Sequence, residues 1–153
     1  TYEDAVGAQP TENAGVINAI PPQRAPKLLD AAGLLSADPT KPFAPVNVLS
    51  YESTNLGKSF IHVIGDASLT TQPKAGHIGN QEAKVCADAL VRLFGGGAPD
   101  PAPVTNSACY STITMSQATW LSAVFQYDPA TRTMAAVPAG ANWRNSVRHP
   151  PST

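Results

Sequence analysis

Apolar residues recur along this chain in two patterns, short continuous runs and a longer helical stripe. Residues 60–64 read Phe-Ile-His-Val-Ile. This run is rich in β-branched and aromatic side chains and too short for a helix, so it predicts a buried strand. Gly65 and Asp66 follow directly. The pattern therefore predicts a carboxylate at the carboxyl end of a strand, where open α/β sheets bind ligands.

The helical stripe predicts an α-helix over residues 79–94, because apolar side chains recur there at spacings of three and four. Asn80 can cap its start, Glu82 lies in the expected first turn, and Arg92 lies in the last. Gly95 supplies the left-handed residue that commonly ends a helix. The helix N-terminus is expected to face the Gly-Asp pair with free amides. The stripe consists of Val85, Cys86, Ala89, Leu90 and Leu93.

Weaker patterns precede these two elements. Residues 16–20 read as a strand ended by two prolines, which lack amides for further pairing. Pro26 suits the start of a short helix that Gly33 ends. A proline-rich loop follows, and residues 46–51 alternate as a strand expected to lie beside 60–64.

A proline-rich linker at residues 98–103 marks a change of architecture. Three strands are predicted after it, over 105–112, 119–127 and 131–137, and the last two are joined by a turn at Asp128-Pro129. They predict a small antiparallel layer. We therefore expect two parts, residues 1–97 and 98–153. The last segment carries Trp143, Arg144, Arg148 and His149 without periodicity, which is typical of a tail.

Composition narrows the function. The chain has 153 residues, a net charge of −1 and 14% charged residues, which argues against nucleic acid or an anionic membrane as the main partner. No apolar run approaches the ~20 residues that cross a bilayer. The 15 prolines and 11 glycines predict a folded but loop-rich chain. Two cysteines are too few to indicate a redox compartment.

Several common sites are not predicted. The three histidines, His62, His77 and His149, lack metal-ligand spacing, and no Ser-His-Asp pattern stands out. Gly57-Lys58-Ser59 ends like a phosphate-binding loop, but Glu52 occupies the position of that motif's first glycine. No G-x-G-x-x-G cradle for a dinucleotide occurs. Arg24 can hold a phosphate or be solvated, and composition alone favours solvation.

Four segments occur in the order and spacing of the flavoprotein subunit of flavocytochrome c sulfide dehydrogenase, and the chain resembles the C-terminal part of that family. The resemblance implies an α/β (α+β) fold, in which the strand-Gly-Asp-helix element of a two-dinucleotide-fold flavoprotein precedes a small antiparallel layer. It also implies an FAD cofactor, sulfide as substrate, a cytochrome c subunit as partner and a periplasmic location. The segments are Val16–Ala25, His62–Ala67, Pro73–Gly76 and Ala108–Ser111.

The resemblance assigns roles around the Gly-Asp pair. Asp66 would accept hydrogen bonds from the ribitol hydroxyls of FAD, although a carboxylate here can also cap a turn. Gly65 would let the backbone approach the cofactor. Lys74 would lie near the flavin pyrimidine edge, or be a solvated surface lysine. Gly76, His77 and Gly79 would bring backbone amides to the same edge.

The two cysteines differ in what the resemblance implies. Cys109 matches the C-terminal member of the family's redox-active cysteine pair, and the alternative is a packed strand thiol. Cys86 falls on the apolar stripe and is expected to be buried. The two are not expected to pair, because they lie in separate layers. A further family cysteine would fall at Ala44, where this chain departs from the pattern.

Sequence and resemblance together predict the C-terminal part of a sulfide dehydrogenase flavoprotein. The dinucleotide cradle would lie upstream of Thr1, in the remainder of the flavoprotein subunit. We therefore expect the isolated chain to bind FAD weakly or not at all and to be inactive toward sulfide. Two alternatives stay open: a non-catalytic interaction module for a cytochrome-like partner, and part of a sulfide:quinone reductase.

Overall fold

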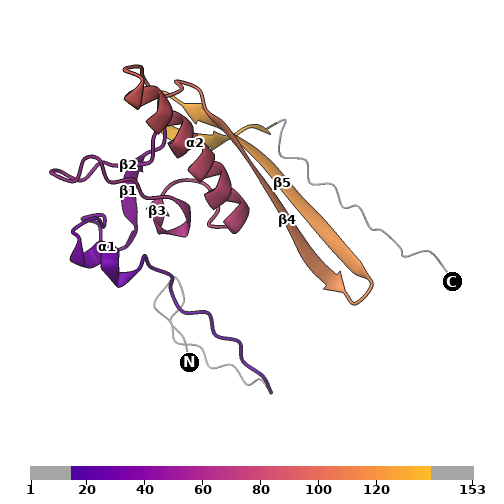
Figure 1. Cartoon of the computed structure of the whole chain (residues 1–153). Coiled ribbons are helices and arrows are strands. Elements are labelled where there is room, and N and C mark those ends of the chain that lie inside the picture. Colours follow the sequence, from indigo (N-terminus) through magenta and orange to yellow (C-terminus); the bar gives the residue numbers. More distant parts are fainter. Residues whose placement is uncertain (1–14, 139–153) are drawn as a thin grey trace.

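The computed structural model describes residues 15–138, and it has a mixed α+β fold with two small sheets and one long helix (Figure 1). Residues 1–14 and the segment containing Trp143, Arg144, Arg148 and His149 lie outside the described residues. In chain order the elements are α1 (Lys27–Ala31), β1 (Ala44–Asn47), β2 (Glu52–Ser53), a 3-10 turn η1 (Gly65–Ala67), β3 (Ser68–Leu69), α2 (Gly76–Phe94), β4 (Val104–Thr114), β5 (Gln117–Asp128) and β6 (Thr133–Ala136).

The first sheet is very short and has the strand order β2-β1-β3. β1 pairs antiparallel with β2, with Val46 opposite Ser53, and parallel with β3, with Ala44 opposite Ser68. Both edges of β1 are therefore occupied. The turn η1 lies between β2 and β3 in the chain and leads directly into β3.

The second sheet is an antiparallel meander in the order β4-β5-β6. β4 and β5 pair from Val104 opposite Gln126 to Thr114 opposite Gln117. β6 pairs only with the last four residues of β5, Phe125 to Asp128. The distal part of the β4–β5 hairpin is thus a two-stranded ribbon, and Figure 1 shows it extending past the rest of the molecule. We call residues 107–123 the outer ribbon.

A single core joins the two sheets and α2. Its buried members are Val48, Ile78, Phe125 and Met134. A buried polar chain runs beside it, in which the Tyr51 hydroxyl donates to Gln72 Oε1 at 3.2 Å and Gln72 Nε2 donates to Thr105 Oγ1 at 2.6 Å. Residues on both sides of position 97 therefore contribute to the same interior.

The two strongest patterns in the sequence are confirmed. α2 forms, but it begins at Gly76, three residues before the predicted start, and its N-cap is Ala75 rather than Asn80. Gly95 has φ −78°, so the left-handed residue at the helix end is Gly96, with φ +77°. The three antiparallel C-terminal strands are also confirmed, including the turn at Asp128-Pro129 between the last two.

Two predicted strands are wrong. Residues 16–20 form no strand, and their large apolar side chains are exposed. Residues 60–64 make only an isolated bridge between His62 and Glu52, and Phe60 is 90% exposed with φ +65°. The reason is that β2 and β3 already occupy both edges of β1. The Gly-Asp pair is consequently not at the end of a strand but in the 3-10 turn between two short segments.

The strand predicted over 46–51 forms only as far as Asn47. The Asn47 side chain then accepts the Leu49 amide at 3.1 Å, and its carbonyl accepts the Ser50 amide at 3.0 Å. Asparagine commonly makes such a local turn in competition with a strand ladder. Tyr51 closes the turn with φ +59° and a fully buried side chain.

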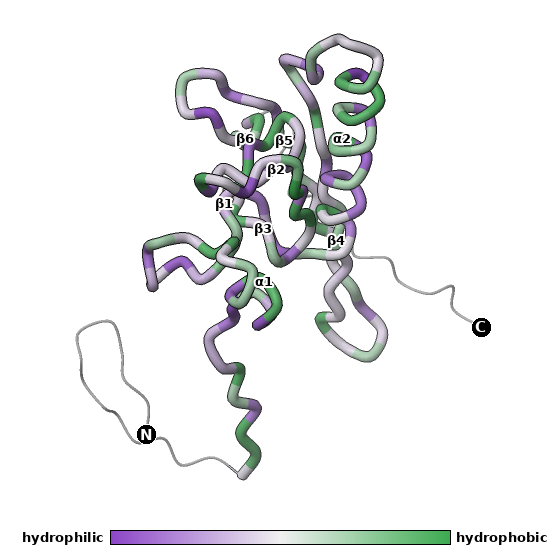
Figure 2. Tube along the Cα trace, turned by 60° about the vertical axis from the view of Figure 1, so that its left-hand side comes forward, coloured by the Kyte–Doolittle hydropathy of each residue, from purple (hydrophilic) through white to green (hydrophobic). Residues whose placement is uncertain are grey.

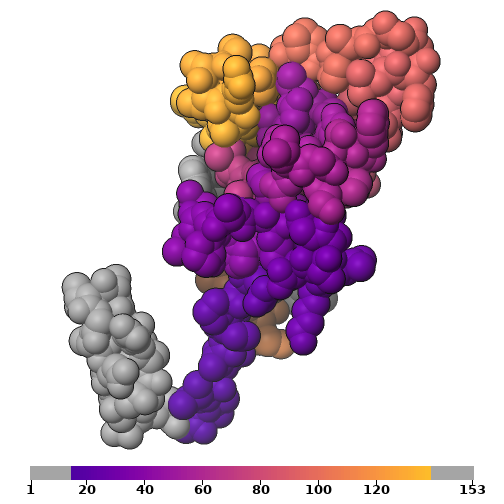
Figure 3. Space-filling view, turned by 90° about the vertical axis from the view of Figure 1, so that its left-hand side faces the viewer, coloured from indigo at the N-terminus to yellow at the C-terminus, as the bar shows by residue number. Residues whose placement is uncertain are grey.

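Apolar residues also lie outside the core. Hydrophobic positions, green in Figure 2, include the last turns of α2, where Val91 and Phe94 are exposed. Figure 3 shows the described N-terminal residues, in indigo, as a narrow arm leaving the body. Within residues 15–138, no helix combines the length and apolar character needed to cross a bilayer.

Candidate functional site

The turn at Gly65 and Asp66 is held from one side by helix α2. Gly65 has φ +70°, a conformation that a side chain would strain. Its amide donates to the Glu82 carboxylate at 2.5 Å. The Ser68 hydroxyl donates to the Gly65 carbonyl at 2.8 Å and also lies 3.3 Å from Glu82 Oε2. Both polar groups of the Gly65 backbone are therefore satisfied within the turn and the helix.

Lys74 holds the same turn from the other side. Its ammonium donates to the Asp66 carbonyl at 2.8 Å and to the Ser68 carbonyl at 2.7 Å. The ammonium also lies 3.8 Å from the centroid of the Phe43 ring, a cation–π distance. Two of its three N–H groups are thus bound to the backbone of the turn. Lys74 is therefore not a freely solvated surface lysine, and two of its hydrogen-bond donors are already used within the chain.

The turn and the helix approach each other closely at two glycines. A Cβ atom on Gly79 would lie 3.2 Å from the Cα of Gly65. A Cβ on Gly76, by contrast, would meet no atom within 4 Å. The missing side chain of Gly79 therefore allows η1 to pack directly on the first turns of α2.

Two opposite charges of this site are partly removed from water. The Glu82 side chain belongs to a residue only 1% exposed, and burial raises the pKa of its carboxyl group, while its hydrogen bonds to Gly65, Ser68 and Thr70 oppose the shift. Burial lowers the pKa of Lys74, and the charges of Asp66 and Glu82 oppose that shift. The two groups therefore stabilise each other's charged form across the turn.

Asp66 is the exposed member of the turn. Its carbonyl binds Lys74, whereas its carboxylate makes no hydrogen bond to any residue within 15–138. The nearby start of α2 has no side-chain cap, and the Gly79 amide is the first to find a carbonyl one turn back, that of Ala75. The amides of Gly76 and His77 therefore lack partners inside the helix. A carboxylate acceptor and uncapped amide donors are exposed beside one another.

The His77 imidazole joins this site to the second sheet, because its Nε2 lies 2.8 Å from the Asn106 side-chain oxygen. His62, in contrast, places Nδ1 2.9 Å from the Ser50 carbonyl. Both rings are used in local structure. Within the described residues, no group of three or more His, Cys, Asp or Glu side chains is arranged to hold a metal.

Cys109 lies apart from the turn, on the outer ribbon. Its register partner is Leu121, so it shares a face with Thr105 and Phe125, which the core covers. Four residues separate it from Thr105, about 13 Å along an extended strand. Cys109 is exposed, Cys86 is buried, and both are free thiols. The expectation that they do not pair is confirmed.

The site residues named from the sequence thus fall into two groups. Gly65, Asp66 and Lys74 are in contact, with Gly76 and His77 at the adjacent helix start. Cys109 belongs to the outer ribbon, where it lies opposite Leu121 and its thiol donates to the Tyr110 carbonyl at 3.8 Å. Two features of the turn were not predicted from the sequence: the bond from the Gly65 amide to Glu82 and the close packing of Gly79 on Gly65. The available signal was position, since Glu82 lies four residues from both Ile78 and Cys86 and so on the buried stripe.

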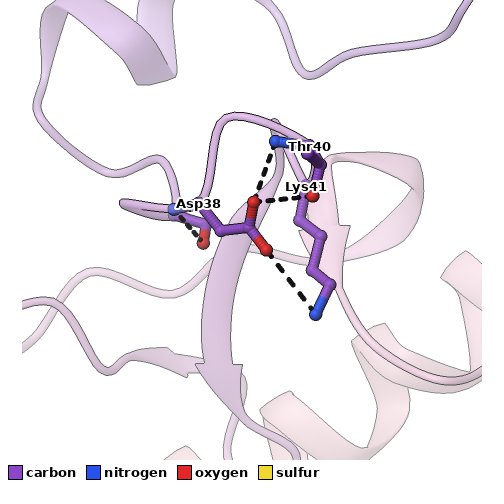
Figure 4. A network of polar contacts seen from close by, with 4 residues as sticks. Asp38, Thr40 and Lys41 are labelled. Carbon is purple, nitrogen blue, oxygen red and sulfur yellow. Dashed lines mark hydrogen bonds and ion pairs between the residues drawn. The ribbon is translucent and has the colours of Figure 1, made fainter.

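A second candidate is an open hollow of about 410 Å³ on the N-terminal side, lined partly by Arg24, Asp30 and Asp38. Figure 4 shows how Asp38 is engaged: its Oδ1 accepts the Thr40 amide and hydroxyl at 2.9 and 2.6 Å, and its Oδ2 lies 3.7 Å from the Lys41 ammonium. Arg24 pairs with Asp30 at 3.3 Å. Arg24 thus takes part in an exposed ion pair, and the Asp38 carboxylate is bound by Thr40 and Lys41.

No model of a known protein family matches the chain.

Proposed function

We propose that this chain is the C-terminal part of the flavoprotein subunit of an FAD-dependent sulfide dehydrogenase, a sulfide:cytochrome c oxidoreductase. In this proposal it contributes the ribitol and isoalloxazine side of the FAD site. The observation that carries the proposal is the Asp66 carboxylate, which is exposed and without a hydrogen-bond partner in residues 15–138, on a turn fixed from both sides. A fixed turn with one free acceptor fits a ligand rich in hydroxyl groups.

The chemistry of the exposed groups suits a flavin. A carboxylate accepts charge-assisted hydrogen bonds from hydroxyl groups, which are stronger than neutral ones, so Asp66 would orient the ribitol chain. The uncapped start of α2 carries a partial positive charge, which typically stabilises a nearby anion by about 0.3–1 kcal/mol. When bound, FAD supplies the two-electron redox chemistry. The amides of Gly76 and His77 would face the ring edge that becomes electron-rich on reduction.

Lys74 has an indirect role in this proposal. Its ammonium is bound to the Asp66 and Ser68 carbonyls, so a direct contact with the flavin would break bonds that fix the turn. Its positive charge would still favour negative charge on a flavin bound at this turn. We assign Lys74 to holding the turn and to favouring negative charge at the site.

The phosphate end of FAD needs a separate cradle. The sequence contains no G-x-G-x-x-G motif, the turn that usually binds a dinucleotide's pyrophosphate at a helix N-terminus. The remainder of the flavoprotein subunit would supply it. The chain alone is therefore expected to hold FAD weakly and not to turn over sulfide.

The ribbon would serve the redox partner. Cys109 is exposed on the face that continues from the core, and we propose it as the C-terminal member of the redox cysteine pair. Its partner is not Cys86, which is buried in α2, so it would come from the remainder of the subunit. The cytochrome c subunit and a periplasmic location belong to the same proposal.

A second function is favoured by one observation on the ribbon. Residues 101–127 contain no charged side chain, and Tyr110 and Trp120 form an exposed cross-strand pair with ring centroids 6.1 Å apart. Exposed aromatic and apolar groups mark protein interfaces. The alternative is therefore a non-catalytic module that binds a cytochrome-like partner.

The visible spectrum of the natively expressed protein separates the two functions. A flavoprotein shows the absorption bands of bound FAD, and sulfide bleaches them before cytochrome c is reduced. A binding module shows no flavin bands and leaves sulfide unchanged. A colourless protein that still binds cytochrome c would contradict the enzyme proposal and support the module.

A further inference from the structure

Glu82 is a charged residue whose side chain the fold buries. Among residues 15–138 it is the one charged side chain in the buried class, and it lies on the core-facing side of α2 between Ile78 and Cys86. Burying a carboxylate is costly unless hydrogen bonds or opposite charge compensate for the lost water. The residues that bind the Glu82 carboxylate therefore indicate its structural role.

Every hydrogen-bond partner of Glu82 belongs to the segment that carries Asp66. Oε2 accepts the Gly65 amide and lies 3.3 Å from the Ser68 hydroxyl, and Oε1 lies 3.4 Å from the Thr70 hydroxyl. The single Ser68 hydroxyl proton already points to the Gly65 carbonyl at 2.8 Å. The Gly65 amide is consequently the main donor to Glu82.

The two sides of the turn are bound by opposite charges. Glu82 takes the N–H of Gly65 on the helix side, and Lys74 takes the carbonyls of Asp66 and Ser68 on the other side. With its backbone bound at both ends, η1 cannot rotate Asp66 inward without breaking a charge-assisted hydrogen bond. The Asp66 side chain is left exposed as a result.

We propose that Glu82 is a positioning residue that holds Asp66 in place for a hydroxyl-bearing ligand. The inference rests on the proposed function for the identity of that ligand, FAD. Glu82 itself is buried and does not touch the ligand. It acts through the Gly65 amide, and its removal would release the turn on the helix side while Lys74 still holds the other.

Glutamine at this position should preserve the function of Glu82. Its side-chain oxygen can take the place of Oε2 and accept the Gly65 amide, and its amide group can then donate to the Thr70 hydroxyl oxygen, which lies 3.4 Å from Oε1. Alanine leaves the Gly65 amide without a partner. Asp88→Ala is the matched control, because Asp88 is an exposed carboxylate on the same helix whose partner is Arg92, at 2.7 Å.

The test measures Gly65 amide hydrogen exchange by NMR in the full chain, together with FAD titration followed by flavin fluorescence. We expect Glu82→Ala to speed Gly65 exchange at least about tenfold, the equivalent of losing a hydrogen bond of about 1.4 kcal/mol. Glu82→Gln and Asp88→Ala should stay near wild type. FAD affinity, measured in the natively expressed protein, should fall in Glu82→Ala and recover in Glu82→Gln.

The possible failures are distinguishable. Unchanged Gly65 exchange in Glu82→Ala overturns the positioning role, whatever FAD does. A normal exchange pattern without FAD binding in any form overturns the flavin function and leaves Glu82 as the residue that fixes the turn.

A titration of wild type gives a second readout if Glu82→Ala does not fold. The Gly65 amide shift should follow the Glu82 carboxyl carbon signal through its titration, and the side-chain signals of the charged and titratable groups around Glu82, Asp66, Lys74 and Tyr51, are recorded alongside it. A Gly65 amide that ignores the Glu82 titration would overturn the proposal.

Discussion

The turn around Gly65 and the outer ribbon are stabilised in opposite ways. At the turn, a buried carboxylate and a lysine each bind the backbone, and two glycines allow close packing. The outer ribbon has no charged side chain and, beyond the reach of β6, no third strand. Its residues are largely exposed on both faces. The turn is specified by side chains, whereas the ribbon depends on its main-chain ladder.

This difference bears on function. A two-stranded ribbon is marginally stable by itself, and sheet edges without charges or prolines readily pair with other chains. The outer ribbon therefore exposes strand edges with which another chain could pair, whereas the backbone of the turn is bound within the chain itself. We expect changes at the turn to alter ligand geometry and changes on the ribbon to alter association.

The largest expected contrast is between two methionines. Met134 is 1% exposed in the core, and Met115 is fully exposed at the ribbon tip. Met134→Ala should lower the free energy of unfolding by about 2–5 kcal/mol, because it opens a cavity. Met115→Ala should change it by less than about 0.5 kcal/mol. Urea denaturation of both variants checks this, and equal losses would contradict the division between core and ribbon.

The two thiols should differ strongly in reactivity. The thiolate is the reactive form, and burial raises the pKa of Cys86, whereas Cys109 is exposed. We expect Cys109 to react with a disulfide reagent at least about tenfold faster than Cys86. Kinetics of labelling on wild type, with Cys109→Ser as the control, measure the ratio. A single common rate would mean that α2 does not protect Cys86.

The close approach at Gly79 predicts a difference between two glycine substitutions. Gly79→Ala places a methyl group 3.2 Å from the Cα of Gly65, whereas Gly76→Ala meets open space. Alanine favours a helix at both positions, but the crowding should make Gly79→Ala less stable than Gly76→Ala by about 1 kcal/mol. Thermal unfolding compares them. Gly79→Ala should also shift the Gly65 amide signal, and an unshifted signal would contradict the packing.

The smallest expected effect is the pH dependence from Glu82. Burial raises the pKa of Glu82 in the folded state above its ordinary value of 4.5, so the folded state binds more protons than the unfolded one in that range. Stability must then fall as pH rises from about 4.5 through the folded pKa. Glu82→Gln should remove this slope and leave the rest of the profile unchanged. A profile that keeps the slope would assign it to another group.

The sequence predicted the elements whose patterns are long. The stripe of α2 and the alternation of the C-terminal strands both span many residues, so each was found despite errors of a few residues at the ends. The strand predicted over residues 60–64 does not form. A short apolar run indicates strand rather than helix but does not say which strand it pairs with, and both edges of β1 are already paired. Which strands pair depends on the whole sheet, and a local sequence pattern carries no information about the other strands.

The site was predicted in part for the same reason. The sequence pattern indicated Gly65 and Asp66 as a pair, but it did not indicate that Glu82 and Lys74 hold their backbone in place. Because the helix was expected to start at residue 79, Glu82 was interpreted as an acid of the first turn, although its spacing of four from Cys86 places it on the apolar stripe. The interpretation of Glu82 as a residue of the helix end left out the main partner of the turn.

Flavin retention by an Asp66 variant tests the central proposal most directly. The natively expressed protein is purified as wild type, as Asp66→Ala and as Asp88→Ala, and the ratio of FAD to protein is measured from absorbance. Asp66→Ala removes the free carboxylate without touching the bonds that Glu82 and Lys74 make to the turn backbone. We predict that Asp66→Ala loses at least about nine-tenths of its FAD under dilution, about 1.4 kcal/mol of binding, while Asp88→Ala keeps it. Full FAD retention in Asp66→Ala would contradict the assignment of this turn to the flavin.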